Sequence, residues 1–150
     1  MKEKISFSTV YGLLFSLVGI AVGGYIVYSG ANEDYDFFFI WAGLGGFLTA
    51  WALSKLFLER NDGLKTEWFF QVSFVTGLLS HWTCWLLLWT WMQIDCWVFD
   101  NLFVDYSMDE PGNFFYGFLA APLFGLFSWA FYGWVTVPLS ILTVYLSKLI

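Results

Sequence analysis

Residues 9–29 read TVYGLLFSLVGIAVGGYIVYS, an apolar run without one charged side chain. The residues that follow it, 30–36, are polar and acidic, and residues 37–57 are again apolar apart from Lys55. Two more apolar stretches follow, Trp68–Trp91 and one that begins near Asn113. An apolar run of about 20 residues has the length of a transmembrane helix. The sequence therefore predicts an all-α, polytopic integral membrane protein in which four transmembrane helices form a single domain, residues 1–150.

The composition supports this class and excludes others. The chain is 59% hydrophobic and 12% charged, whereas a soluble domain carries about 25% charged residues. So few charges could not cover a water-facing surface, but a bilayer removes that requirement. The basic start, MKEK, leads into an apolar run without a small-residue cleavage site, which predicts a retained first span rather than a removed signal peptide. Nucleic-acid binding is excluded because the chain has no extended basic patch.

The charges are sorted between alternate gaps, which predicts the orientation. One set of gaps holds all six basic residues, and the other holds eight of the twelve acids. Basic residues mark the cytoplasmic side of a membrane. We therefore expect a multi-pass protein of a bacterial inner membrane with both termini in the cytoplasm. The basic residues are Lys2, Lys4, Lys55, Arg60, Lys65 and Lys148, and the segregated acids are Glu33, Asp34, Asp36, Asp95, Asp100, Asp105, Asp109 and Glu110.

The last apolar segment, from Asn113 to Ile150, is too long for one straight span. As one helix it would exceed 50 Å at about 1.5 Å per residue. We expect one long helix kinked at Pro122 and Pro138. Two spans joined near Tyr132–Gly133 are the alternative, but they would put Lys148 outside, against the charge rule. Residues 134–150 could span, re-enter or lie at the interface.

Hydroxyl side chains follow one face of this last segment at helical spacing. They could rest at the headgroup level, line a contact with another helix, or bond back to carbonyls of their own helix. The residues are Thr136, Ser140, Thr143 and Ser147.

Small residues recur at helical spacing in three of the spans, which indicates close helix packing. In lipid, helices associate by backbone contact that small side chains permit. We call each such row of small residues a seam. The seams could pack inside one bundle or join subunits of a homo-oligomer or a larger membrane complex. They are Gly12, Ser16, Gly19 and Gly23; Ala42, Gly46, Ala50 and Ser54; and Gly117, Ala121 and Gly125.

The third span carries the chain's one histidine, His81, near mid-membrane. Ionisable groups at this depth are costly and often functional. His81 could be a hydrogen-bonded packing residue, a proton-sensitive or pore-facing residue, or half of a metal pair with Cys84. The sequence offers no further ligand at this depth, whereas a zinc site normally has three or four protein ligands. We therefore expect no metal and no other cofactor. The neighbouring polar candidates are Thr76, Ser80, Thr83 and Cys84, with Ser73 and Thr90 close to the same face.

The gap after the third span, Met92–Gly112, alternates acids with apolar residues. This pattern could form an amphipathic element on the outer leaflet, a cation-concentrating ring around an axis, or simply a solvated loop. The acids are Asp95, Asp100, Asp105, Asp109 and Glu110.

The spans lack the paired acids, histidine clusters or serine–histidine pairs that membrane enzymes need, so we expect no catalytic residues and no enzymatic activity. The leading hypothesis is a non-enzymatic inner-membrane protein that acts through helix–helix assembly, as a homo-oligomeric sensor or scaffold, an immunity-type protein or an accessory subunit. The alternative is a small channel or transporter, with a polar path near His81 and an acidic outer vestibule.

Overall fold

A computed structural model of the protein describes residues 6–29, 37–59, 66–99 and 114–150. These residues form four helices: α1 (Phe7–Tyr28), α2 (Phe38–Phe57), α3 (Thr66–Val98) and α4 (Phe114–Ser147). Each helix is long and apolar enough to cross a membrane. The expectation of an all-helical chain with four membrane-length helices is therefore confirmed.

The start of α1 is held by two oxygen acceptors. The Ser6 hydroxyl caps the helix and accepts a hydrogen bond from the Thr9 backbone N–H at 3.3 Å. The Glu59 carboxylate, just beyond the end of α2, accepts one from the Ser8 backbone N–H at 2.8 Å. A negative charge at a helix N-terminus is favourable because the first N–H groups lack intrahelical partners. Glu59 therefore ties the end of α2 to the beginning of α1.

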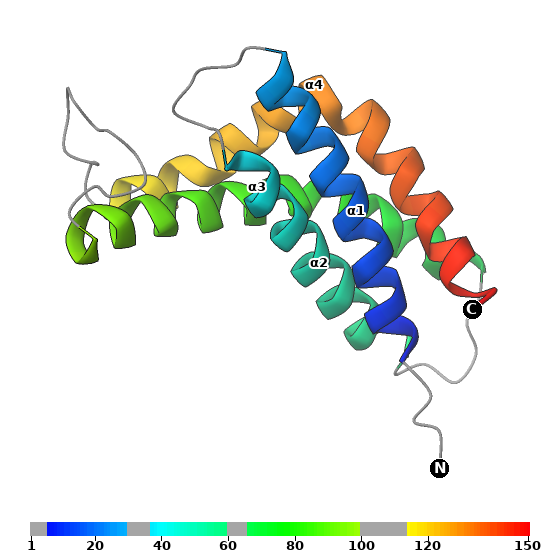
Figure 1. The fold of residues 1–150 in the computed structure, drawn as a ribbon. Helices are drawn as coiled ribbons and strands as arrows, with labels where there is room; N and C mark the ends of the chain where they lie inside the picture. Colours follow the sequence, from blue (N-terminus) through cyan, green and yellow to red (C-terminus); the bar gives the residue numbers. More distant parts are fainter. Residues whose placement is uncertain (1–5, 30–36, 60–65, 100–113) are drawn as a thin grey trace.

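The helices alternate in direction, so the bundle has two distinct ends. Figure 1 shows α1 and α2 side by side, with α3 crossing them steeply and α4 changing direction between its yellow first half and its orange-to-red second half. The beginning of α1 and the end of α4 line one common hollow. We call this side, where α2 ends and α3 begins, the terminal end, and the opposite side the far end.

Helices α1 and α2 approach each other closely along their small residues. A methyl group built on Gly19 would collide with the backbone carbonyl of Ala42, and one on Gly23 would lie 2.7 Å from the Phe39 Cα. From the other side, a methyl on Gly46 would lie 3.1 Å from the Phe15 carbonyl oxygen. The two predicted seams therefore face each other within one chain.

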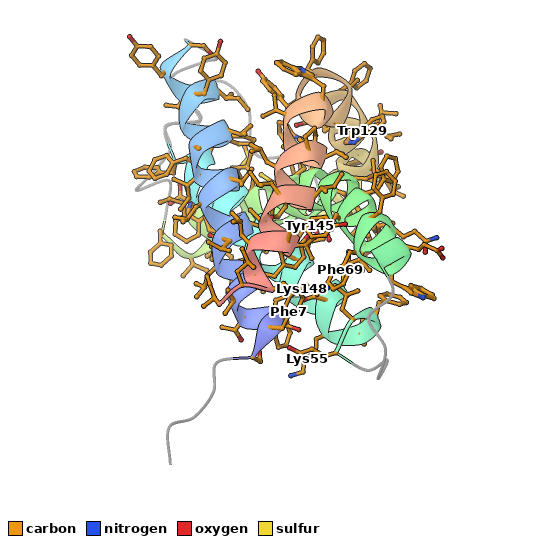
Figure 2. All side chains as sticks on the ribbon, turned by 90° about the vertical axis from the view of Figure 1, so that its right-hand side faces the viewer. Phe7, Lys55, Phe69, Trp129, Tyr145 and Lys148 are labelled. Carbon is orange, nitrogen blue, oxygen red and sulfur yellow. The ribbon has the colours of Figure 1, made fainter. Side chains whose placement is uncertain are left out.

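Helices α3 and α4 also approach closely, and here glycines of α4 lie against tryptophans of α3. A methyl on Gly117 would collide with the Trp89 indole, and one on Gly125 would lie 3.0 Å from the Trp82 Cα. The third seam therefore also has its partner inside the chain. Nearer the terminal end, Figure 2 shows Phe69 of α3 beside Tyr145 and Lys148 of α4.

Two sequence expectations about helix ends meet different outcomes. We expected the third span to end at Trp91, which is wrong because α3 continues to Val98. The added residues include an acid but no glycine or proline, and a polar residue alone does not stop a helix. The alternative turn at Tyr132–Gly133 does not form, since both residues lie inside α4.

Two apolar clusters make up the core. The first lies toward the terminal end and contains Tyr11, Phe15, Ala50, Leu58, Phe69, Val72 and Val144; the second lies toward the far end and contains Phe38, Cys84 and Leu88. Polar side chains are buried between and beside these clusters, which is the feature that defines the candidate site.

Candidate functional site

His81, halfway along α3, is hydrogen-bonded through both ring nitrogens to α4. Its Nδ1 lies 2.8 Å from the Ser128 hydroxyl and its Nε2 lies 3.0 Å from the Thr136 hydroxyl. The side chain is buried, with 8% of its surface exposed. A buried polar group normally needs such partners, and His81 has one for each nitrogen.

These two bonds connect parts of α4 that a straight helix would hold apart. At about 1.5 Å per residue, Ser128 and Thr136 would lie about 12 Å apart along the axis of a straight helix. One imidazole ring reaches both, and α4 changes direction in its middle (Figure 1). His81 therefore joins two positions of α4 that lie about two helical turns apart in the sequence.

A small cavity lies against His81, between the four helices. Its volume is about 40 Å³, and all four helices contribute to its wall. Ser80, His81, Ser128 and Thr136 form its polar side, while α1 and α2 supply an apolar side that includes Val22 and Phe38. A water molecule needs at least about 10–15 Å³, so the cavity has room for water.

A second pair of hydroxyls lies one helical turn from Thr136, toward the terminal end. The Tyr11 hydroxyl of α1 and the Ser140 hydroxyl of α4 are 2.6 Å apart, and neither side chain is exposed. Thr143 and Ser147 follow along α4, both buried, and their hydroxyls donate to the carbonyls of Ser140 and Thr143. The predicted hydroxyl stripe therefore divides into two parts. Thr143 and Ser147, nearer the terminal end, bond back to their own helix. Thr136 and Ser140 bond instead to His81 and Tyr11.

Two more hydroxyls, both on α3, face this pair. Ser73 and Thr76 are fully buried and lie close to the Tyr11 hydroxyl. Tyr11 therefore brings hydroxyls of α3 and α4 together in one buried polar group.

The polar side chains form one column between the terminal end and mid-bundle. At the terminal end, Ser147 also lines a hollow of about 680 Å³ together with Glu59 and Lys148. The column then runs past Thr143 and the Tyr11–Ser140 pair, and it ends at His81 and the central cavity. Phe38 and Cys84 of the second apolar cluster form part of the cavity wall, and Leu88 packs with them.

The bonding around His81 is compatible with more than one protonation state. A neutral imidazole donates through one nitrogen and accepts through the other, and its protonated form donates through both. A serine or threonine hydroxyl can rotate to donate or accept. His81 can therefore exchange its two neutral forms, or take up a proton, without losing either hydrogen bond.

The structure joins some of the predicted site residues and separates others. Ser80 and Cys84 line the cavity with His81, as the shared-face prediction requires. Thr76 lies nearer the terminal end, beside Tyr11. Thr83 faces α2, where its hydroxyl is 3.0 Å from that of Thr49. The spacing along α3 predicted one polar face, but that face divides among three neighbouring helices.

Sequence reasoning missed two partners. Ser128 had no distinguishing signal, because it is one isolated hydroxyl in an aromatic segment, and Tyr11 was hidden among the aromatics of the first span. Only the packing of α1 and α4 on α3 brings them to the site.

The acidic cluster is described only in part. Asp100, Asp105, Asp109 and Glu110 lie outside the described residues, as do Lys2, Lys4, Arg60 and Lys65. Asp95, which was expected in an outer loop, lies inside α3 and is fully buried. That expectation is wrong for Asp95 because the helix extends past Trp91 and turns this side chain toward the protein.

Metal-binding residues do not cluster in the described part of the chain. No group of three or more His, Cys, Asp or Glu side chains is positioned there to hold an ion. His81 and Cys84 both line the cavity, but its other wall residues are hydroxyl-bearing or apolar. Both cysteines are free thiols.

Comparison with other proteins gives no relative to argue from: no family model, curated protein or solved structure matches this chain.

Proposed function

We propose that the protein is a small, non-enzymatic channel or transporter of the bacterial inner membrane that moves protons by way of His81. The observation that carries the proposal is the bonding of His81, which joins both ring nitrogens to hydroxyls at the inner end of a buried polar column. A lipid-embedded bundle needs few polar groups inside it, and an intramembrane histidine on such a column suits a proton relay. The cavity beside His81 has room for water, which can carry protons to the ring.

The orientation follows from the charge rule and gives the path its direction. With both termini in the cytoplasm, the terminal end is the cytoplasmic end, and Lys55 and Lys148 lie there in Figure 2. The hydroxyl column then connects the cytoplasm with mid-membrane, and the acids of the third gap lie outside. Protons reach His81 from the cytoplasmic side, while the Phe38–Cys84–Leu88 cluster closes the outer half.

Passage to the outer side then requires a second conformation, and the bend of α4 is the element that supplies it. Pro138 lies inside α4, where its ring displaces the carbonyl of Trp134 and removes one helical hydrogen bond. Pro122 has the same effect in the first half. We propose that α4 kinks at these prolines, and that loss of one His81 bond lets it straighten.

Proton flux into liposomes tests this function. The purified protein is reconstituted with an internal pH-sensitive dye, and a potassium gradient with valinomycin supplies the driving force. His81→Gln keeps a donor and an acceptor for Ser128 and Thr136, but an amide neither gains nor loses a proton at neutral pH. We expect at least a tenfold loss of flux in His81→Gln.

The matched control is Thr90→Val, because the Thr90 hydroxyl donates to the Leu86 carbonyl of its own helix, at 2.7 Å, and not to a residue of the polar column. This variant should keep the wild-type flux. Equal flux in wild type and His81→Gln, or wild-type flux no greater than that of protein-free liposomes, would overturn the proposal.

Helix–helix assembly is the second candidate, and the exposure of α4 favours it. In the most apolar 18-residue stretch of α4, only 17% of the residues are buried, whereas the share is 28–44% in the other three helices. Its first half presents Phe115, Tyr116, Leu119, Leu123 and Phe127 to the surroundings. Lipid covers such a face in a monomer, and a partner helix or a second copy covers it in a scaffold or an accessory subunit.

A further inference from the structure

We propose that Glu59 is the residue that supplies protons to the polar column from the terminal end. Glu59 lines the hollow of about 680 Å³ at that end, and the same wall contains Ser147, the last hydroxyl of the column. This names a second proton-binding residue besides His81, so it rests on the function proposed above.

Hydrogen bonds hold Glu59 in place at the end of α2. The backbone N–H groups of Leu58 and Glu59 both donate to the Ser54 carbonyl, at 2.8 and 2.9 Å. One oxygen of the Glu59 carboxylate accepts from the Ser8 backbone N–H at 2.8 Å. An ionised carboxylate has two oxygens and about four acceptor sites, so a carboxylate that makes this bond can still take up a proton.

Helix capping alone does not call for a charge at Glu59. The carboxylate is favourable at the N-terminus of α1, but it is unfavourable at the C-terminal end of its own helix, α2. Helix α1 also has an uncharged cap, because the Ser6 hydroxyl accepts from the Thr9 N–H. An amide oxygen could accept from the Ser8 N–H without placing a negative charge at the end of α2. A carboxylate in this position therefore points to a role for its charge.

The hollow connects Glu59 with the surface. Its wall includes Leu149 and Ile150, which are both largely exposed. Among the described wall residues, those of α1 carry no charge, and Lys148 of α4 is the other charged side chain. The Lys148 ammonium lies 4.7 Å from the centre of the Phe69 ring, which belongs to the apolar core. The cation is thus held against α3, and Glu59 is the acid of the described wall.

The transfer needs only the exchange of one proton. The Glu59 carboxylate takes up a proton from the aqueous side, becomes a neutral carboxyl, and returns to the carboxylate when it releases the proton toward Ser147. The Ser147 hydroxyl donates to the Thr143 carbonyl at 2.7 Å, and it can rotate to accept and pass on a proton. A negative charge at such an entrance raises the arrival rate of cations by about tenfold or more.

Glu59→Gln separates proton supply from helix capping, because the amide oxygen can still accept from the Ser8 N–H but the amide does not titrate. The assay uses inverted membrane vesicles from bacteria that express the protein, in which the terminal end faces the external buffer. In dilute external buffer we expect the His81-dependent proton uptake of Glu59→Gln to fall by about tenfold. Concentrated external phosphate, a small proton carrier that can enter the hollow, should restore it, and the Tm should be unchanged.

Glu67→Gln is the matched control. Glu67 lies in the first turn of α3 at the same end, but it is exposed and outside the wall of the hollow. Glu67→Gln should keep the wild-type uptake in dilute buffer, and Glu59→Asp, which retains a carboxylate, should keep most of it.

Three results would overturn the role of Glu59: wild-type uptake in Glu59→Gln, a loss that phosphate does not restore, or an equal loss in Glu67→Gln. The outcome is separable from the function. Uptake that depends on His81 but not on Glu59 removes this residue and keeps the proton path, whereas uptake that His81→Gln leaves unchanged removes both.

Discussion

At the scale of single residues, the contact between α1 and α2 depends on the absence of a Cβ at particular positions. Gly19 and Gly24 lie in the same helix, but a methyl on Gly19 would collide with the Ala42 carbonyl, whereas one on Gly24 would meet nothing within 4 Å. Gly19→Ala should destabilise the protein by about 1–3 kcal/mol through overpacking. Gly24→Ala should be neutral or stabilising, because alanine is the better helix former by about 0.5–1 kcal/mol. Thermal unfolding in one detergent measures both, and equal effects would show that the α1–α2 contact is not as close as described.

The same scale shows why the site was only partly predictable. His81 was identified from its sequence because a lone histidine in an apolar span is conspicuous. Its partners were not, since a single hydroxyl such as Ser128 gives no periodic signal and becomes a partner only when α4 bends around the imidazole. Sequence periodicity reports which residues share a face of one helix, but not which helix that face meets.

At the scale of helices, hydropathy predicted the number and approximate position of the membrane-length elements but not all of their ends. The predicted end at Trp91 came from the onset of polar residues, whereas α3 ends only at Val98. Backbone hydrogen bonding continues through a polar residue such as Asp95, so a hydropathy boundary and a helix boundary need not coincide. The longer α3 carries Cys96, which is half-buried, well away from the buried Cys84.

This placement gives a test of orientation at the helix scale. If the far end of α3 lies outside the cell, a membrane-impermeant maleimide should label wild-type protein on intact cells, and Cys96→Ser should abolish the labelling because Cys84 is buried. In a variant that lacks both cysteines, Leu149→Cys, at a position with 82% of its surface exposed, should react only after the cells are permeabilised. Labelling of Leu149→Cys on intact cells would reverse the orientation and, with it, the direction of the proposed path.

At the scale of the whole molecule, the seams that suggested an oligomer are used inside one chain. Gly19 and Gly23 contact α2, and Gly117 and Gly125 contact the tryptophans of α3, so close backbone packing does not call for a second subunit. Among the exposed apolar side chains are several on the first half of α4, for example Tyr116 and Leu119, each 73% exposed. These side chains can be covered by lipid without any loss, because lipid tails are as apolar as a partner helix.

We therefore expect the proton path to work in a monomer, which separates the two proposed functions. Native mass measurement in a mild detergent should give one chain of 17.3 kDa, and liposomes prepared at less than one protein per vesicle should retain His81-dependent flux. A stable dimer or larger assembly that Leu119→Asn disrupts, while the single chain stays folded, would instead favour the assembly function. Leu13→Asn, on the exposed side of α1, is the matched control, since it introduces the same amide into an apolar surface away from α4. Disruption by both substitutions would mean that the amide perturbs the bundle itself, and only a loss confined to Leu119→Asn would identify α4 as the contact between subunits.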